Sequence, residues 1–162
     1  MEAMTTTQSP ITDRGNRCIR NHVGFAMAAA VIPVPMADVT AITAVEADML
    51  RALNKIYGRK WLDGKGKQIL GIAAAATVGP AAWASFAKVV PGLGSVVGGG
   101  AQMVLAGSIC FALGKAYQGH LESGGEVFDA ETFKEEMKRH IKEGKRIARG
   151  MKKDVQKRAD AS

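Results

Sequence analysis

Few side chains in this sequence of 162 residues have the type and setting that chemistry requires. Glu46 is a carboxylate in an apolar helical pattern, with Ile42 and Leu50 four positions away on either side. No Lys or Arg lies three or four positions from it. A carboxylate in apolar surroundings has a raised pKa and can exchange a proton in a reaction. Glu46 is therefore a possible functional acid, and the ordinary alternative is that the helix turns it to water or to a partner chain.

Other catalytic and metal-binding patterns are missing from the sequence. The three histidines are scattered, Cys18 and Cys110 form no CxxC pair, and no group has metal-ligand spacing. The HLESGG stretch that starts at His120 lacks the GxSxG pattern of a hydrolase nucleophile. We expect its glycines to end a helix instead. We therefore expect no enzyme activity, no metal and no cofactor. A weaker alternative is an enzyme or metal-binding protein that uses Glu46, or His120 with Glu122.

The glycine-rich stretch PGLGSVVGGG, residues 91–100, does not match a phosphate-binding loop. Its glycines follow a GxGxxxG spacing, whereas dinucleotide-binding loops have GxGxxG between a strand and a helix. A second stretch, from Gly58, is one residue too long for a Walker A loop and has Gly66 where a hydroxyl is required. Nucleotide binding is therefore not expected.

The glycines instead fit a helix-packing pattern with a period of four. Small residues at this interval let two helices approach closely, and in a membrane such contacts drive association. The pattern occurs in two neighbouring segments, and the predicted helix-packing residues are Gly71, Ala75, Gly79, Gly94, Gly98, Ala106, Cys110 and Gly114.

The periodicity predicts an all-α fold made of two helical hairpins and a C-terminal amphipathic basic helix. Residues 1–20 are expected to be a disordered polar tail, residues 21–125 an Ala/Gly-rich helical domain, and residues 126–162 a charged helix and tail. Helices are expected over about 18–32, 36–57, 68–90, 95–120 and 130–156, with Gly58 ending the second. Proline-containing turns, IPVP at 32–35 and PGLG at 91–94, would connect each hairpin.

Two of these segments have the length of a membrane crossing. Residues 69–87 and 89–114 carry no charge, although alanine and glycine make each only marginally hydrophobic. Basic residues flank the pair outside, whereas Lys88 is the one cation of the connecting loop. This asymmetry predicts a membrane-associated protein with both termini in the cytoplasm. The runner-up is a soluble helical homo-oligomer that buries the same segments between subunits.

The last helix combines a narrow apolar stripe with many cations, and the whole chain has a net charge of +7. Such a helix could lie on anionic lipid, pair with a copy of itself or pack on the core. We expect its basic residues to face anionic head groups or a partner, and we do not expect nucleic acid there. These residues are Lys138, Arg139, Lys142, Lys145, Arg146, Arg149, Lys152 and Lys153.

Three stretches together carry a resemblance to a known family, namely IPVPMADVTAITAVEADMLRALNKIYG, VPGLGSVVGGGAQMVLAGSICFALGKAY and HLESGG. They resemble an uncharacterised helical domain family that is often joined to small Era-like GTPase domains and occurs in membrane-associated bacterial proteins. The likeness covers roughly residues 21–145. The resemblance implies an all-helical, membrane-associated module and supplies no catalytic residues. Because a GTPase domain is missing from this chain, the resemblance leads us to expect a GTPase partner in trans, or self-association through the glycine and alanine positions.

Overall fold

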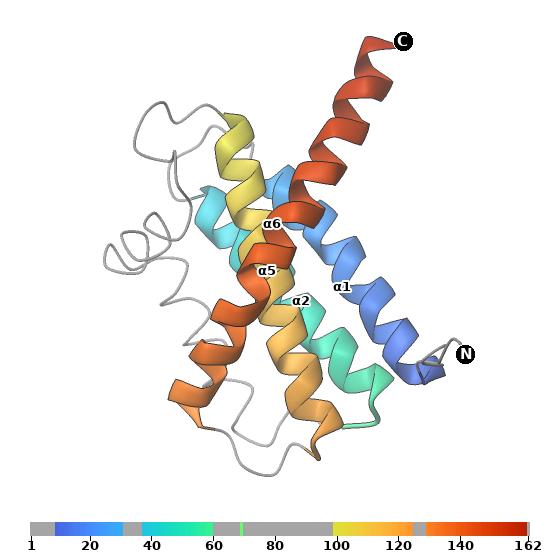
Figure 1. Ribbon diagram of the computed structural model, residues 1–162, viewed down its shortest axis with the longest axis vertical. Coiled ribbons are helices and arrows are strands. Elements are labelled where there is room, and N and C mark those ends of the chain that lie inside the picture. Colours follow the sequence, from blue (N-terminus) through green and yellow to red (C-terminus); the bar gives the residue numbers. More distant parts are fainter. Residues whose placement is uncertain (1–8, 31–36, 60–68, 70–98, 125–128, 162) are drawn as a thin grey trace, which may run out of the picture.

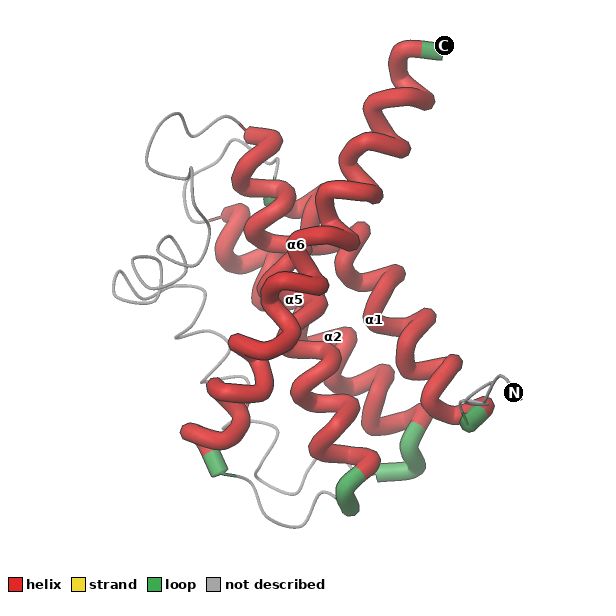
Figure 2. Tube along the Cα trace, in the orientation of Figure 1, coloured by secondary structure: helices red, strands yellow, loops and turns green. Residues whose placement is uncertain are grey.

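The computed structural model describes residues 9–30, 37–59, 69, 99–124 and 129–161. These residues form four helices and no strand: α1 (Pro10–Ala29), α2 (Ala37–Ile56), α5 (Gly99–Glu122) and α6 (Ala130–Asp160) (Figures 1 and 2). The predicted all-α fold is confirmed. Both predicted proline-containing turns lie outside the described residues, as does the helix predicted over 68–90, apart from the buried helical residue Ile69.

The first helix begins earlier than the sequence pattern indicated. α1 starts at Pro10, directly after Ser9, and Asp13 lies in its first turn. Proline suits the first helical position because its fixed φ fits a helix and its missing N–H is not needed there. The prediction of a disordered tail over residues 1–20 is therefore wrong from Pro10 onward. Residues 1–8 lie outside the described part of the chain.

Glycines end two of the helices at the expected places. Gly58 follows α2 with a φ of 66°, and Gly124 follows α5 with a φ of 100°. Both angles lie in the left-handed region that glycine adopts without a Cβ clash. The predicted stop of the second helix at Gly58 is confirmed. The glycines of the HLESGG stretch were also expected to end a helix, and Gly124 does so.

α5 is the central helix, packed against α1, α2 and α6 (Figure 1). The ridge positions Ala106, Cys110 and Gly114 are all buried within the chain. At Gly114 a Cβ would lie only 2.9–3.0 Å from atoms of Ile19 in α1 and Met49 in α2. These three positions thus pack on helices of the same chain and are not left free for a second copy. Gly71, Ala75, Gly79, Gly94 and Gly98 lie outside the described residues.

No helix in the described ranges combines the length and the apolar character needed to cross a membrane. α5 includes residues 99–114 of the second uncharged segment, and residues 89–98 of that segment lie outside the described residues. The predicted first crossing, over residues 68–90, lies outside the described residues apart from Ile69.

α6 has a packed part and a projecting end. Asp129 caps its start by accepting hydrogen bonds from the backbone N–H of Thr132 at 2.8 Å and from its hydroxyl at 2.6 Å. Apolar residues up to Ala148 belong to the same core as α1, α2 and α5. Met151 still packs against this core, whereas residues 153–161 are all exposed where the helix extends past the other three (Figure 1). Of the three roles predicted for this helix, packing on the core therefore holds for its first part.

Candidate functional site

Glu46 faces the interior of the helix bundle. Its side chain is 0% exposed, and neither carboxylate oxygen has a hydrogen-bond partner among the described residues. Burial raises the pKa of this carboxyl group to about 8, because the charged form loses its hydration in the interior. The alternative that α2 turns Glu46 to water is therefore wrong. Near neutral pH the group is mainly protonated.

The surroundings of Glu46 include the thiol of Cys110 on α5. Burial raises the pKa of Cys110 well above its usual range, and the charges of Glu46 and Cys18 raise it further. Cys110 lies 3.8 Å from the sulfur of Met49, the neighbour of Glu46 one turn along α2. Both acidic groups are thus held in their neutral forms in the core. The arrangement can store a proton, and Glu46 stays a predicted functional acid.

The described residues contain no group of three or more His, Cys, Asp and Glu side chains arranged to hold a metal ion. The two residues considered for half a metal site have other contacts. His120 stacks on Tyr117, with ring centroids 6.2 Å apart. The carboxylate of Glu122 accepts hydrogen bonds from the hydroxyls of Tyr57 at 2.6 Å and Thr12 at 2.9 Å.

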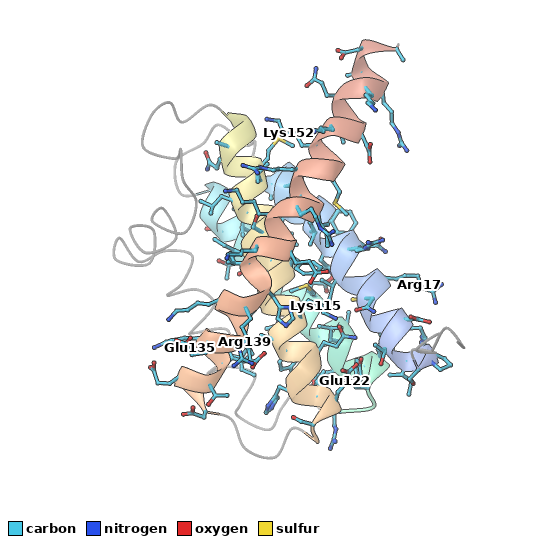
Figure 3. The ribbon with its side chains drawn as sticks, viewed as in Figure 1. Arg17, Lys115, Glu122, Glu135, Arg139 and Lys152 are labelled. Carbon is cyan, nitrogen blue, oxygen red and sulfur yellow. The ribbon has the colours of Figure 1, made fainter. Side chains whose placement is uncertain are left out.

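Those hydroxyl contacts belong to a polar network that ties the ends of three helices together. Gln118 of α5 is buried, and its amide nitrogen donates to the Tyr57 hydroxyl at 3.0 Å and to the Thr12 carbonyl at 3.2 Å. Figure 3 shows Glu122, a member of this network, at one end of the helix bundle. Sequence reasoning missed this network because its members come from helices that are far apart in sequence. Its role is to fix the relative positions of α1, α2 and α5.

The first part of α6 pairs its own charges. Lys138 lies 2.6 Å from Glu135, and Arg139 lies 2.7 Å from Glu136, each three positions away along the helix. These two predicted basic residues therefore have acidic partners within the same helix. Such exposed pairs add little stability, but they leave little net charge on this part of the surface.

The later cations of α6 form a continuous row on its solvent-facing side. We call this row the basic ridge, and it consists of Lys142, Arg146, Arg149, Lys153 and Lys157, all of them exposed. Their spacing of three or four residues places them on one helical face. With a rise of 1.5 Å per residue the ridge is about 22 Å long. Within the described part of the chain its only ion pair is Arg146 with Glu143, at 3.9 Å.

Two other predicted basic residues lie at the edges of the ridge. The side chain of Lys152 (labelled in Figure 3) contacts the start of α5, and its ammonium lies close to the position that a Cβ at Gly100 would take. Partial burial lowers the pKa of Lys145, and the positive charge of Arg149 lowers it further. This second effect shows that the cations here repel one another. The ridge is thus a surface that an external anion would neutralise.

Two comparisons place the chain among known proteins, while no solved structure matches it. The chain is 30% identical over 159 residues to "Magnetosome membrane protein 22" of Magnetospirillum gryphiswaldense. The aligned region covers 91% of this chain and 82% of that relative. Residues 1–146 match the domain of unknown function DUF697. The match spans most of the chain, and it also includes most of the helices described above. The chain therefore belongs to the DUF697 family.

Proposed function

We propose that this protein is a non-enzymatic, membrane-associated helical protein that binds anionic lipid surfaces through the basic ridge of α6. The observation that carries the proposal is the ridge itself, because five exposed cations on one face have a single ion pair between them among the described residues. The relative from Magnetospirillum gryphiswaldense is also named as a membrane protein.

Electrostatics gives this interaction a useful strength. A Lys or Arg close to an anionic membrane surface contributes about 1 kcal/mol, and the contribution falls off within a Debye length. Five such residues in a straight row can contact the surface at the same time. Because the first part of α6 is packed on α5, the ridge has a fixed direction relative to the bundle. Binding would therefore orient the whole protein on the membrane.

Further features belong to the same proposal. The cytoplasmic leaflet is the anionic one, so both termini would lie on the cytoplasmic side. Self-association would use the small-residue positions outside the described residues, from Gly71 to Gly98, and a GTPase acting in trans would be the partner that the resemblance implies. The competing proposal is a soluble helical homo-oligomer that buries those segments between subunits.

Vesicle binding tests the proposal. The full chain would be mixed with vesicles of phosphatidylglycerol and phosphatidylcholine and sedimented, and a variant with Arg149→Gln, Lys153→Gln and Lys157→Gln would be compared with it. A matched control replaces Lys134, Lys138 and Arg139, which lose the same total charge but are paired with acids. We expect the ridge variant to bind roughly 100-fold more weakly, from about 1 kcal/mol per cation. The control should bind nearly as well as the natural chain.

Three results would contradict the proposal. The first is equal weakening by both variants, which would mean that total charge, not the ridge, controls binding. The second is unchanged binding to vesicles of phosphatidylcholine alone. The third is a chain that does not bind vesicles and elutes as a defined oligomer in size-exclusion chromatography, as the soluble homo-oligomer requires.

A further inference from the structure

The two cysteines of the chain have opposite environments. Cys110 lies in the core with 0% exposure, and burial raises the pKa of its thiol well above the usual range. Cys18 is half-buried on α1, one helical turn before His22. Buried apolar thiols are inert, whereas accessible thiols beside a cation are reactive. Any thiol chemistry of the folded protein therefore concerns Cys18.

His22 is held between two acceptors. Its Nδ1 lies 2.8 Å from the backbone carbonyl oxygen of Cys18 and 3.7 Å from the Cys18 sulfur. Its Nε2 lies 3.1 Å from a carboxylate oxygen of Asp48 on α2. A carbonyl and a carboxylate can only accept, so both ring nitrogens must donate. The contacts therefore require the imidazolium form.

The pKa of His22 agrees with this assignment. The hydrogen bond with the Cys18 side chain is the largest cause of a rise to about 9, burial opposes the rise, and the Cys18 carbonyl and Asp48 add to it. His22 is 8% exposed, so the ring is fixed by packing as well as by its hydrogen bonds. A fixed cation thus lies beside a half-buried sulfur.

The surroundings limit the reaction that such a sulfur can perform. Cys18 lies in the middle of α1, where the backbone N–H groups are used in helix hydrogen bonds. No backbone donors are left there to stabilise the oxyanion of an acyl-transfer reaction. Attack on a small electrophile that needs no oxyanion site, such as a disulfide, has no such requirement. An imidazolium helps that attack because it stabilises the thiolate, which is the nucleophile.

We propose that Cys18, together with His22 and Asp48, is a redox-modification site that accepts low-molecular-weight disulfides. The Cys18 thiolate attacks one sulfur of the disulfide, and a new S–S bond forms while the old one breaks. The Cys18 thiol loses one proton to form this thiolate, and the departing thiolate gains one proton, so the number of bound protons does not change. The Cys18 sulfur is oxidised. One half of the small disulfide leaves as a thiol, and the other half stays bound to Cys18 in a mixed disulfide.

The test uses the folded full-length chain with glutathione disulfide, and intact-protein mass spectrometry follows the adduct over time. We expect one glutathione per chain, located on Cys18 by peptide mapping and removed by dithiothreitol. His22→Gln should slow the reaction about tenfold, equivalent to about 1.4 kcal/mol. Asp48→Asn should slow it about threefold, because the carboxylate holds the imidazolium but does not touch the sulfur.

Two outcomes would overturn the inference. One is an adduct on Cys110 in the folded protein. The other is a rate that neither variant changes, which would make Cys18 an ordinary accessible thiol. Circular dichroism checks that the variants fold, and if His22→Gln does not, Asp48→Asn decides. The Asp48 side chain is 73% exposed, so its replacement leaves the core unaltered.

Discussion

The core around Glu46 and the basic ridge of α6 both hold ionisable groups that mostly lack an ion-pair partner among the described residues, but only one of the two regions is exposed to water. Glu46 has no hydrogen-bond partner among the described residues and is 0% exposed. The ridge cations are all exposed to water. The interior raises the pKa of Glu46 to about 8, so the carboxylate is neutralised by a proton. On the surface, the same lack of partners leaves the charge in place and available to another molecule.

Exposure thus decides what a charge without a partner does. Removing an ion from water costs far more than a surface ion pair returns. Glu46 should therefore influence folding stability, and the ridge should influence binding.

The largest effect is expected for Glu46→Gln. The folded-state pKa of about 8 is above the ordinary carboxyl pKa of 4.5, so the folded protein binds more protons than the unfolded chain between these pH values. The free energy of unfolding of the natural chain should therefore fall as pH rises from 4.5 to 8. Glutamine does not titrate, so the variant should gain stability relative to the natural chain by on the order of 4 kcal/mol over this range.

Denaturant unfolding at pH 5, 6.5 and 8 measures that difference. Asp13→Asn on the exposed surface of α1 is a suitable control, because it removes an acid without altering the core. A difference between Glu46→Gln and the natural chain that does not change with pH would mean that Glu46 is solvated in the folded state.

A pair of glycines in α6 tests where the interior ends along this helix. A Cβ at Gly144 would lie 2.7 Å from the backbone oxygen of Ser108, whereas a Cβ at Gly150 would meet nothing within 4 Å. Gly144→Ala should destabilise the protein by about 1–3 kcal/mol because α5 and α6 must separate. Gly150→Ala should stabilise it by about 0.5–1 kcal/mol through helix propensity. Thermal unfolding of the two variants would show shifts of opposite sign, and shifts of equal sign would disprove the assigned boundary.

The His22–Asp48 pair is intermediate, since one partner is buried and the other is exposed. The folded-state pKa of His22, about 9, is above the ordinary histidine pKa of 6.5. The stability from its contacts is therefore fully present below pH 6.5 and is lost as pH rises through 9. Asp48→Asn should cost up to about 1 kcal/mol at pH 6, because solvent screens the exposed carboxylate. At pH 10 the cost should vanish, and equal costs at both values would rule out a charged His22.

The smallest effect on stability is expected for the ridge. Replacing Arg149, Lys153 and Lys157 by glutamine should change the free energy of unfolding by no more than about 0.5 kcal/mol, because exposed positions without close partners contribute little. Chemical denaturation of this variant beside the natural chain measures the change. A loss of several kcal/mol would mean that the ridge packs on another part of the chain.

The helix stops at Gly58 and Gly124 could be predicted because they depend on local backbone geometry. The isolation of Glu46 was also visible in sequence, but its burial depends on how α1 and α5 pack on α2. The uncharged residues of α5 suggested a membrane crossing. An alanine- and glycine-rich core helix and a weakly hydrophobic membrane helix have the same composition, so the sequence pattern alone does not distinguish them. His22 and Asp48 lie 26 residues apart on different helices, so no local pattern connects them.

Along α6, the pairing of Lys138 with Glu135 follows from a three-residue spacing that the sequence displays. The basic ridge could not be predicted from residue spacing alone. Its exposure depends on which side of α6 packs on α5 and on the helix extending to Asp160, four residues beyond the expected end.

Lipid contact at the ridge can be measured directly with two glycines that have open space around them, Gly150 next to the ridge and Gly24 on α1. Each is replaced by cysteine in a Cys18→Ser background, labelled with a fluorophore and exposed to an aqueous quencher with and without anionic vesicles. We predict that vesicles protect the label at position 150 and leave the label at position 24 accessible. Protection at 24 alone, or at neither position while the protein is bound, would contradict docking through the basic ridge.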